Sequence, residues 1–253
     1  MSGILSVCHL GPTPYREGLA LQEALVRRCA AARGRPAGGA EVADWLLFPE
    51  HAPVLTVGRG GSEESLRVSR EFLAARGIEL FEVTRGGDMT WHGPGQLVGY
   101  PIVDLERRGR DLHRYLRDLE EVLIQALEGW GVPARRVLGS TGVWAGDEKI
   151  ASLGIAVRQW VGYHGFALNV APDLGFFELI HPCGLRDIHM TSVAARLGAA
   201  APTLAEARRE VAGLLAHRLG YDGIRWVPAE EVRNLAASIE TTTATFTTAH
   251  HAA

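Results

Sequence analysis

The stretch TGVWAGDEKIASLGIAVRQWVGYHGFALNV, residues 141–170, decides the fold class. It holds three consecutive runs of β-type composition, and the connections between them are short. Strands joined by such short connections run antiparallel, because a parallel crossover needs a dozen residues or more. We therefore predict an antiparallel meander, which favours an α+β protein over a series of β-α-β units.

Helical patterns flank this meander on both sides. Residues 111–131 place leucine, valine and alanine on one helix face behind an aspartate that can serve as N-cap. A second helix is predicted over residues 15–33, and a short one begins after Ser69. Downstream, residues 192–198 and 203–220 have the pattern of two further helices.

Shorter β-type runs complete the expected sheet. The runs DWLLFPE (44–50) and APVLTVG (52–58) are predicted to form a buried strand pair, and IELFEVT (78–84) and LVGYPIVDL (97–105) are predicted strands. No segment reads as a linker. We expect one α+β domain over residues 1–240, with a mixed, mostly antiparallel sheet and flanking helices. The low-complexity run TTTATFTTAHHAA (241–253) is predicted to be a disordered tail.

Composition excludes several classes of function. The chain has 253 residues, 47% hydrophobic and 22% charged, as in ordinary soluble globular proteins. Its net charge of −3 argues against a nucleic-acid binder, which normally carries a basic excess. No apolar run is long enough to span a membrane and the N-terminus does not resemble a signal peptide, so we expect a cytoplasmic protein.

Cysteine and lysine usage is more specific. The three cysteines, Cys8, Cys29 and Cys183, are odd in number and scattered, so they form neither a disulfide framework nor a CxxC zinc motif. Of the 26 basic residues, Lys149 alone is a lysine. An amine can give up its proton and a guanidinium cannot, so this residue is a candidate for acid–base chemistry.

Cys183 and Lys149 are the candidate catalytic pair. Cys183 lies in HPCG, where a turn would expose the thiol and nearby backbone N–H groups would favour the thiolate. The 34 residues between the two positions allow two antiparallel strands and a turn, so the side chains can meet at one sheet end. A cysteine beside a lysine is an activated nucleophile. The alternatives are an inert buried thiol and a solvated edge-strand lysine.

The glycine-rich run RGGDMTWHGPGQ (85–96) is a candidate binding loop, because glycine lets the backbone approach a ligand closely. It matches neither a Walker A loop nor a GxGxxG fingerprint. His164 could face the same pocket, although a strand histidine is more often a core residue. There is no GxSxG and no HExxH motif. Only His181 and Cys183 have metal-ligand spacing, so we predict no metal site.

Four segments together resemble a known family: RGGDMTWHGPGQLVGYPI (85–102), GVWAGDEKIASLGIAV (142–157), YHGFALNV (163–170) and FELIHPCGL (177–185). In this order they are similar to the lipoyl(octanoyl) transferases, the octanoyl-[acyl carrier protein]:protein N-octanoyltransferases. The resemblance covers roughly residues 8–220. It implies a fold shared with lipoate and biotin protein ligases.

The resemblance also implies a mechanism. Cys183 would take an octanoyl group from the phosphopantetheine of acyl carrier protein as a thioester, and Lys149 would act as acid and base. The acyl group would then pass to a lysine of a lipoyl domain, in 2-oxoacid dehydrogenase complexes or the glycine cleavage H protein. The thioester keeps the group-transfer potential of the donor, so the enzyme would need no cofactor and no ATP.

By the same resemblance, the substrate-contacting segments lie in the glycine-rich run and on two strands. They are Arg85, Gly86, Gly87, Asp88, Met89, Thr90, Trp91, His92, Ser152, Leu153, Gly154, Gly165, Phe166 and Ala167, with His164 as a possible accessory residue. Acyl carrier proteins are acidic, so we expect an arginine-rich docking patch around Arg107, Arg108 and Arg110, although a solvated helix face explains these residues equally well.

Three other functions remain open at this point. An ATP-dependent lipoate or biotin protein ligase would share the fold but has no use for a nucleophilic thiol, so Cys183 favours the transferase. An octanoyl amidotransferase acting between lipoyl-bearing proteins would differ in its donor. A non-catalytic acyl-binding module would be unaffected by loss of the thiol.

Overall fold

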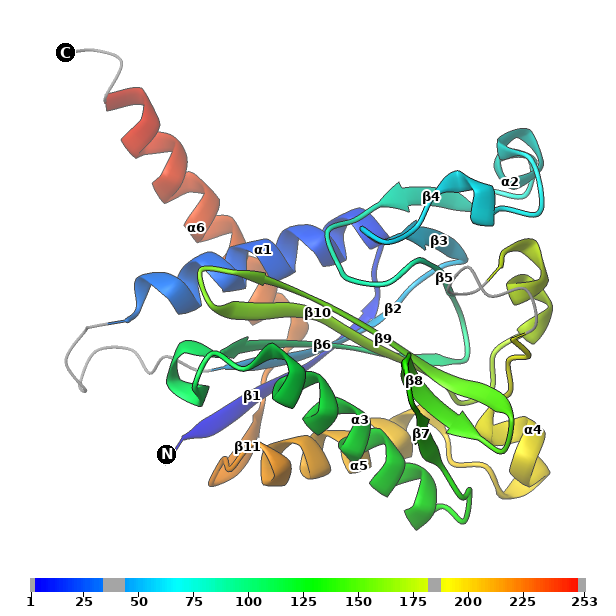
Figure 1. Ribbon diagram of the computed structural model, residues 1–253. Coiled ribbons are helices and arrows are strands. Elements are labelled where there is room, and N and C mark those ends of the chain that lie inside the picture. The colour runs from blue at the N-terminus through cyan, green and yellow to red at the C-terminus, as the bar shows by residue number, and fades with distance from the viewer. Residues whose placement is uncertain (1–2, 34–43, 182–187, 250–253) are drawn as a thin grey trace.

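An eight-stranded mixed sheet forms the centre of the computed structural model, which describes residues 3–33, 44–181 and 188–249 (Figure 1). Its strand order is β11-β1-β2-β6-β10-β9-β8-β7. The strands span Ile4–Pro12 (β1), Trp45–Glu50 (β2), Gln96–Asp104 (β6), Arg135–Val137 (β7), Ser140–Ala145 (β8), Glu148–Arg158 (β9), Val161–Asn169 (β10) and Gly223–Trp226 (β11).

The meander predicted over residues 141–170 is confirmed. Strands β8, β9 and β10 pair antiparallel in sequence, and β10 pairs antiparallel with β6. At the other side of the sheet, β1 pairs in parallel with both β2 and β11. The sheet is therefore mixed and mostly antiparallel, as expected.

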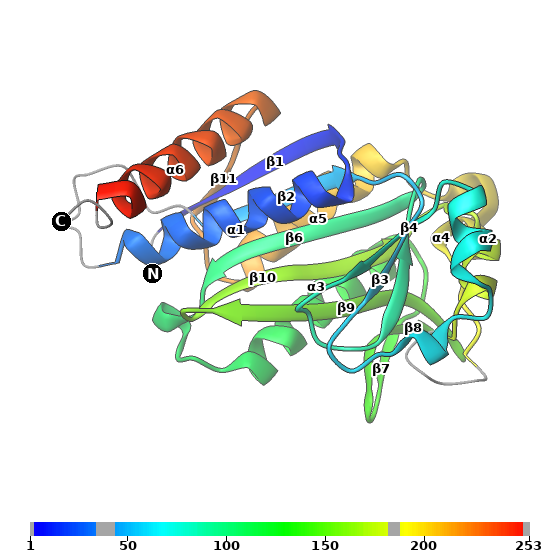
Figure 2. The same cartoon turned by 90° about the horizontal axis from the view of Figure 1, so that it is seen from above.

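Helices cover both faces of this sheet (Figure 2). Helices α1 (Tyr15–Ala31) and α6 (Ala229–Ala249) lie on one face, and α3 (Leu112–Gly129) and α5 (Leu204–Arg218) lie on the other. The cap predicted for α3 is present, since Asp111 accepts a hydrogen bond from the Arg114 N–H. Ser192 likewise caps the short α4 (Val193–Leu197). None of the described helices combines the length and the apolar character needed to cross a membrane.

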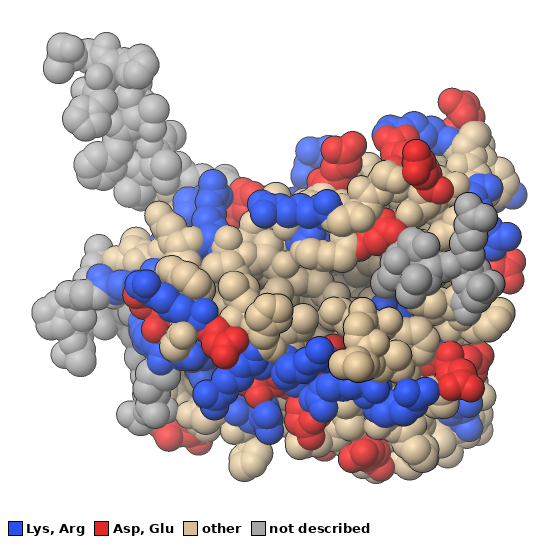
Figure 3. Space-filling view, viewed as in Figure 1, with Lys and Arg blue, Asp and Glu red and all other residues tan. Residues whose placement is uncertain are grey.

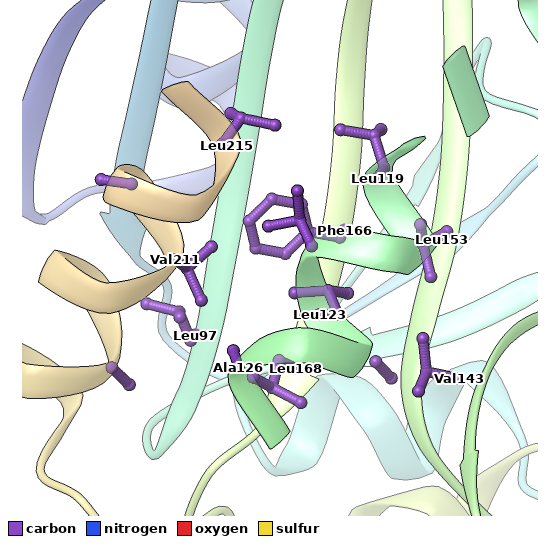
Figure 4. Close-up of a cluster of buried hydrophobic side chains, with 14 of the residues drawn as sticks. Leu97, Leu119, Leu123, Ala126, Val143, Leu153, Phe166, Leu168, Val211 and Leu215 are labelled. Carbon is purple, nitrogen blue, oxygen red and sulfur yellow. The ribbon is translucent and has the colours of Figure 1, made fainter. Parts of the chain in front are cut away.

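The largest apolar core lies between the sheet and the pair α3 and α5 (Figure 4). Leu119 and Leu123 of α3 and Val211 of α5 converge there on Phe166 of β10. All four side chains are almost completely buried. Full burial of each such side chain is worth about 1.5–3 kcal/mol, so this layer holds the long strands β9 and β10 firmly in place.

A second, three-stranded sheet corrects one prediction. Strand β3 (Val54–Val57) does not pair with β2; it lies between β4 (Glu79–Glu82) and β5 (Met89–His92) in a separate sheet. Only three residues separate β2 from β3, and the chain passes from one sheet to the other there. Helix α2 (Arg70–Ala75) begins after Ser69, which accepts a hydrogen bond from the Phe72 N–H as a helix N-cap does.

The remaining elements are short, except at the C-terminus. Helix α6 continues to Ala249, into the segment for which the sequence predicts disorder, and its run contains no proline or glycine that would end a helix. Short 3-10 helices complete the described chain at Glu63–Ser65 (η1), Glu106–Arg108 (η2), Leu174–Leu179 (η3) and Gly198–Ala200 (η5).

Candidate active site

One pocket gathers most of the candidate residues. It encloses about 490 Å³ of empty space, part of which is open to solvent. Of the candidates named from the sequence, it is lined by Arg85, Gly87, Asp88, Met89, Thr90, His92, Lys149, Ser152, Leu153, Gly154, His164, Gly165, Phe166 and Ala167.

Two candidates do not line this pocket. Trp91 stacks on Phe176 with ring centroids 4.9 Å apart and belongs to another apolar cluster. Successive side chains of a strand point to opposite faces, so Trp91 points away where His92 points in. Gly86 instead donates its N–H to the Ile155 carbonyl at 2.9 Å and so attaches the glycine-rich loop to β9. Cys183 lies outside the described residues.

The chain on each side of the HPCG segment is held beside pocket residues. At its first residue, the His181 backbone N–H donates to the Ser65 carbonyl at 2.7 Å, and the Ser65 hydroxyl donates to Asp88 Oδ2 at 3.0 Å. After it, the Lys149 N–H donates to the His189 carbonyl at 2.9 Å. Residues far apart in sequence are thus brought to one end of the large sheet.

Lys149 is buried, with 2% of its surface exposed. Its Nζ lies 5.9 Å from the centroid of the Trp144 ring, over which the cation–π interaction is favourable. Lysine is rarely buried to this degree in proteins without a structural or chemical reason. The amine is therefore shielded from water but lines the pocket, where a reacting group would meet it.

Gly142 on β8 makes room for this side chain. A Cβ at this position would lie 2.5 Å from Cε of Lys149 and 2.8 Å from the carbonyl oxygen of Ala151. The backbone there also has φ +137°, which side chains seldom adopt. The Lys149 side chain can therefore occupy this place only beside a glycine, which no pattern in the sequence indicates.

Arg85 shapes the wall opposite β9. Its guanidinium donates to the Thr56 carbonyl at 2.9 Å, to Thr56 Oγ1 at 2.8 Å and to the Asp88 carbonyl at 2.7 Å. These acceptors belong to the protein itself, so the buried charge organises the glycine-rich loop. Gly154 admits that loop, because a Cβ there would lie 2.7 Å from the Gly86 carbonyl oxygen.

Two tyrosines that sequence reasoning missed also line the pocket. Tyr15 begins α1 and Tyr100 lies on β6, and both are buried. The Tyr100 hydroxyl donates to Nε2 of His51 at 2.8 Å, while Nδ1 of His51 donates to the Thr13 carbonyl at 2.8 Å. The alternation of side chains along β6 was the one available signal for Tyr100, but its partner strands had to be known first.

Three histidines in and beside the pocket are held neutral. Burial lowers the pKa of His51 to about 4 and those of His92 and His164 to about 3. His164 also has a positive φ of 56°, and its backbone N–H donates to Oε1 of the buried Gln22 at 2.8 Å. Such strained conformations concentrate at functional sites.

The other two cysteines are poor nucleophiles. Cys8 and Cys29 are buried in the core beneath α1 and α6. Burial raises the pKa of the Cys8 thiol to about 11 and raises that of Cys29 as well. Both therefore remain protonated at neutral pH. Burial therefore argues against Cys8 and Cys29 as the nucleophile, and Cys183 stays the candidate that the sequence predicts.

The arginines of the expected docking patch do not line the pocket, and each forms an ion pair. Asp104, which ends β6, pairs with Arg107, whereas Gln96 begins that strand beside the pocket. Arg108 pairs with Asp44, and Arg110 pairs with a neighbouring glutamate. In the view of Figure 3, basic side chains form a band across the molecule with acidic ones among them. The patch therefore offers less free positive charge than its sequence suggests.

The chain is similar to known proteins over most of its length. Residues 14–214 match the family model described as the lipoyl protein ligase A/B catalytic domain. The chain is 49% identical over 216 residues to an octanoyltransferase of Geobacter metallireducens, covering 84% of this chain and 94% of that protein. It is 47% identical over 215 residues to an octanoyltransferase of Rubrobacter xylanophilus, covering 84% and 92%.

Solved structures support the fold. A crystal structure of lipoate-protein ligase A bound with ATP superposes with a TM-score of 0.73 at 21% identity, covering 94% of each chain. P. falciparum LipL1 in complex with lipoate gives 0.72 at 10% identity, covering 94% of this chain and 70% of that one. At such identities the likeness concerns the fold alone. The relatives of higher identity place the chain more narrowly: it belongs to the octanoyltransferases, acyltransferases of the lipoyl protein ligase A/B family.

Proposed function

We propose that this enzyme transfers an octanoyl group from octanoyl-acyl carrier protein to a lysine of a lipoyl domain, through a thioester on Cys183. Lys149 acts as the acid and base. The observation that carries the proposal is the placement of Lys149, the one lysine of the chain, which is buried and lines a pocket together with small residues of β9 and β10.

In the first half-reaction the Cys183 thiolate attacks the thioester carbonyl of the donor. A new C–S bond forms to Cys183, and the C–S bond to phosphopantetheine breaks. The proton that Cys183 lost passes through the Lys149 amine to the departing thiolate. The Lys149 ammonium also stabilises the attacking thiolate electrostatically.

In the second half-reaction the ε-amine of a lipoyl-domain lysine attacks the acyl-enzyme. An amide bond forms, the C–S bond to Cys183 breaks, and the neutral Lys149 amine takes the proton from the attacking nitrogen. That proton returns to the Cys183 thiolate. One thioester is consumed and one amide is formed, so atoms and charge balance without ATP or another cofactor.

The pocket suits a straight acyl chain. Glycine, serine and alanine on β9 and β10 form walls that leave space for the chain. Burying a methylene group is worth about 0.8 kcal/mol, so the octanoyl chain contributes several kcal/mol to binding. The same walls give the enzyme its preference among acyl lengths.

A mass-spectrometric experiment tests the proposal. The protein is incubated with octanoyl-acyl carrier protein without ATP and quenched in acid. We expect one octanoyl adduct that hydroxylamine removes, that maps to Cys183 and that chases onto an added lipoyl domain. A hydroxylamine-resistant adduct would be an amide, and Lys149 and the N-terminus are the amines that could carry it. Three results would contradict the proposal: an adduct at another residue, an absence of any adduct from the wild type as well as from Cys183→Ser, or a requirement for ATP.

Gly142→Ala is expected to lower the transfer rate about tenfold, because the added methyl group displaces the Lys149 side chain that it would touch. The strained backbone should also cost about 1 kcal/mol of stability. Gly146→Ala is the matched control, since Gly146 has φ +61° but nothing within 4 Å of the added Cβ. Equal transfer rates in the two variants, measured beside their urea midpoints, would show that Gly142 is not needed for Lys149.

A further inference from the structure

The hydrogen-bonded pairing between β10 and β9 does not extend as far as Lys149, near the beginning of β9. This pairing ends at Ala151, and Lys149 forms an isolated parallel bridge with Met190 instead. The Lys149 N–H donates to the His189 carbonyl, and the Lys149 carbonyl accepts from the Thr191 N–H, both at 2.9 Å. The segment around Met190 therefore takes the place of β10 beside Lys149.

Side-chain amides hold this replacement segment. Asn169, the last residue of β10, donates from Nδ2 to the Thr191 carbonyl at 3.0 Å. Its Oδ1 accepts from Nε2 of Gln96 at 3.0 Å, and the two residues are direct cross-strand partners on β10 and β6. Oε1 of Gln96 in turn accepts from Nδ1 of the pocket histidine His92 at 2.8 Å.

The donor and the acceptor of each hydrogen bond in this series are fixed. Nε2 of Gln96 also donates to the Trp91 carbonyl at 3.2 Å, so its Oε1 must face His92. His92 therefore carries its proton on Nδ1, and Nε2 is left as an acceptor. His92, Gln96, Asn169 and Thr191 are all buried, where a satisfied polar network fixes one arrangement and a broken one is costly.

We propose that Gln96 and Asn169 are positioning residues, an amide relay that joins the pocket histidine His92 to the backbone of Lys149 through Thr191. The relay fixes the position of the first residues of β9 and thereby the position of the Lys149 amine in the pocket. It acts through other groups and does not itself touch the substrate. Its kinetic consequence rests on the proposed acyl transfer.

Asn169→Asp tests the relay with little change of shape. A carboxylate still accepts from Gln96 but cannot donate to the Thr191 carbonyl. At pH 8 we expect faster hydrogen exchange at the N–H groups of Thr191 and Lys149. We expect kcat for octanoyl transfer to fall about ten- to a hundredfold, with the KM for octanoyl-acyl carrier protein nearly unchanged.

Acidification supplies a signature that a general loss of packing would not give. A protonated carboxyl regains a donor for the Thr191 carbonyl, and burial raises the pKa of such a group. The ratio of variant to wild-type kcat should therefore rise between pH 8 and pH 6. Asn234→Asp, at an exposed position of α6, adds the same charge and should change neither exchange nor kcat.

Two results would overturn the inference. In the first, Asn169→Asp has the same hydrogen-exchange rates and the same kcat as the wild type. In the second, the ratio of variant to wild-type kcat is independent of pH. If that variant does not fold, Asn169→Leu and Gln96→Met take its place, and wild-type kcat in either folded variant has the same meaning. The exchange measurement needs no acyl donor. An absence of transfer by the wild type would therefore count against the proposed function, while the exchange rates still test the relay.

Discussion

Replacing Lys149 with arginine is expected to lower kcat for octanoyl transfer about 10²–10⁴-fold while an octanoyl adduct still forms on Cys183. In the first half-reaction the Cys183 proton would then reach the departing thiolate through water, more slowly than through the Lys149 amine. Arginine still keeps the positive charge that stabilises the attacking thiolate. It does not release its proton in proteins, so it cannot deprotonate the attacking lysine in the second. The acyl-enzyme should therefore accumulate, and intact-mass measurement before and after addition of a lipoyl domain would reveal it.

Lys149→Met is the companion variant, because methionine removes both the charge and the proton acceptor. Both half-reactions should be slow in this variant, so the adduct on Cys183 should form more slowly than in Lys149→Arg. Urea denaturation of the two variants shows whether the buried site still folds around the new side chain. Transfer by Lys149→Arg within about tenfold of the wild type would mean that Lys149 is not the base.

Acid is expected to destabilise the protein in a window set by its buried histidines. The pKa values of His51, His92 and His164, about 4, 3 and 3, lie below the usual value of 6.5. Between pH 6.5 and about 4 the unfolded chain therefore binds protons that the folded chain does not, so stability falls as the pH falls. Each histidine contributes roughly 1 kcal/mol per pH unit within that window.

Urea unfolding at intervals from pH 7.5 to pH 5 measures this slope above the range where ordinary carboxyl groups titrate. Burial raises the pKa of Asp44, so this group stabilises the folded protein as the pH falls and opposes the effect of the histidines. It is one group against three, so the net slope keeps the sign set by the histidines. His51→Gln should flatten the slope, whereas His113→Gln, at an exposed position of α3, should leave it unchanged. A free energy of unfolding that stays constant from pH 6.5 to pH 5 would contradict the prediction.

Much of the chain's local structure could be predicted from sequence. The helix at residues 111–131 and the short helix after Ser69 follow from apolar periodicity and capping residues, which act within a few positions. The meander over 141–170 follows from short connections, which leave antiparallel pairing as the available geometry. The motifs around Lys149 and Cys183 identified the family that the comparisons then supported.

Only the tertiary structure decided which distant segments meet. It separated β3 from β2 into another sheet, turned Trp91 away from the pocket and brought Tyr15 and Tyr100 into it. It also placed the Gly142 backbone against the Lys149 side chain. Strand pairing and the face that a side chain occupies depend on neighbours far away in sequence, because a shift of one residue in register reverses every side chain. The sequence by itself therefore determined the local elements and the reactive residue types, and long-range packing determined the pocket they share.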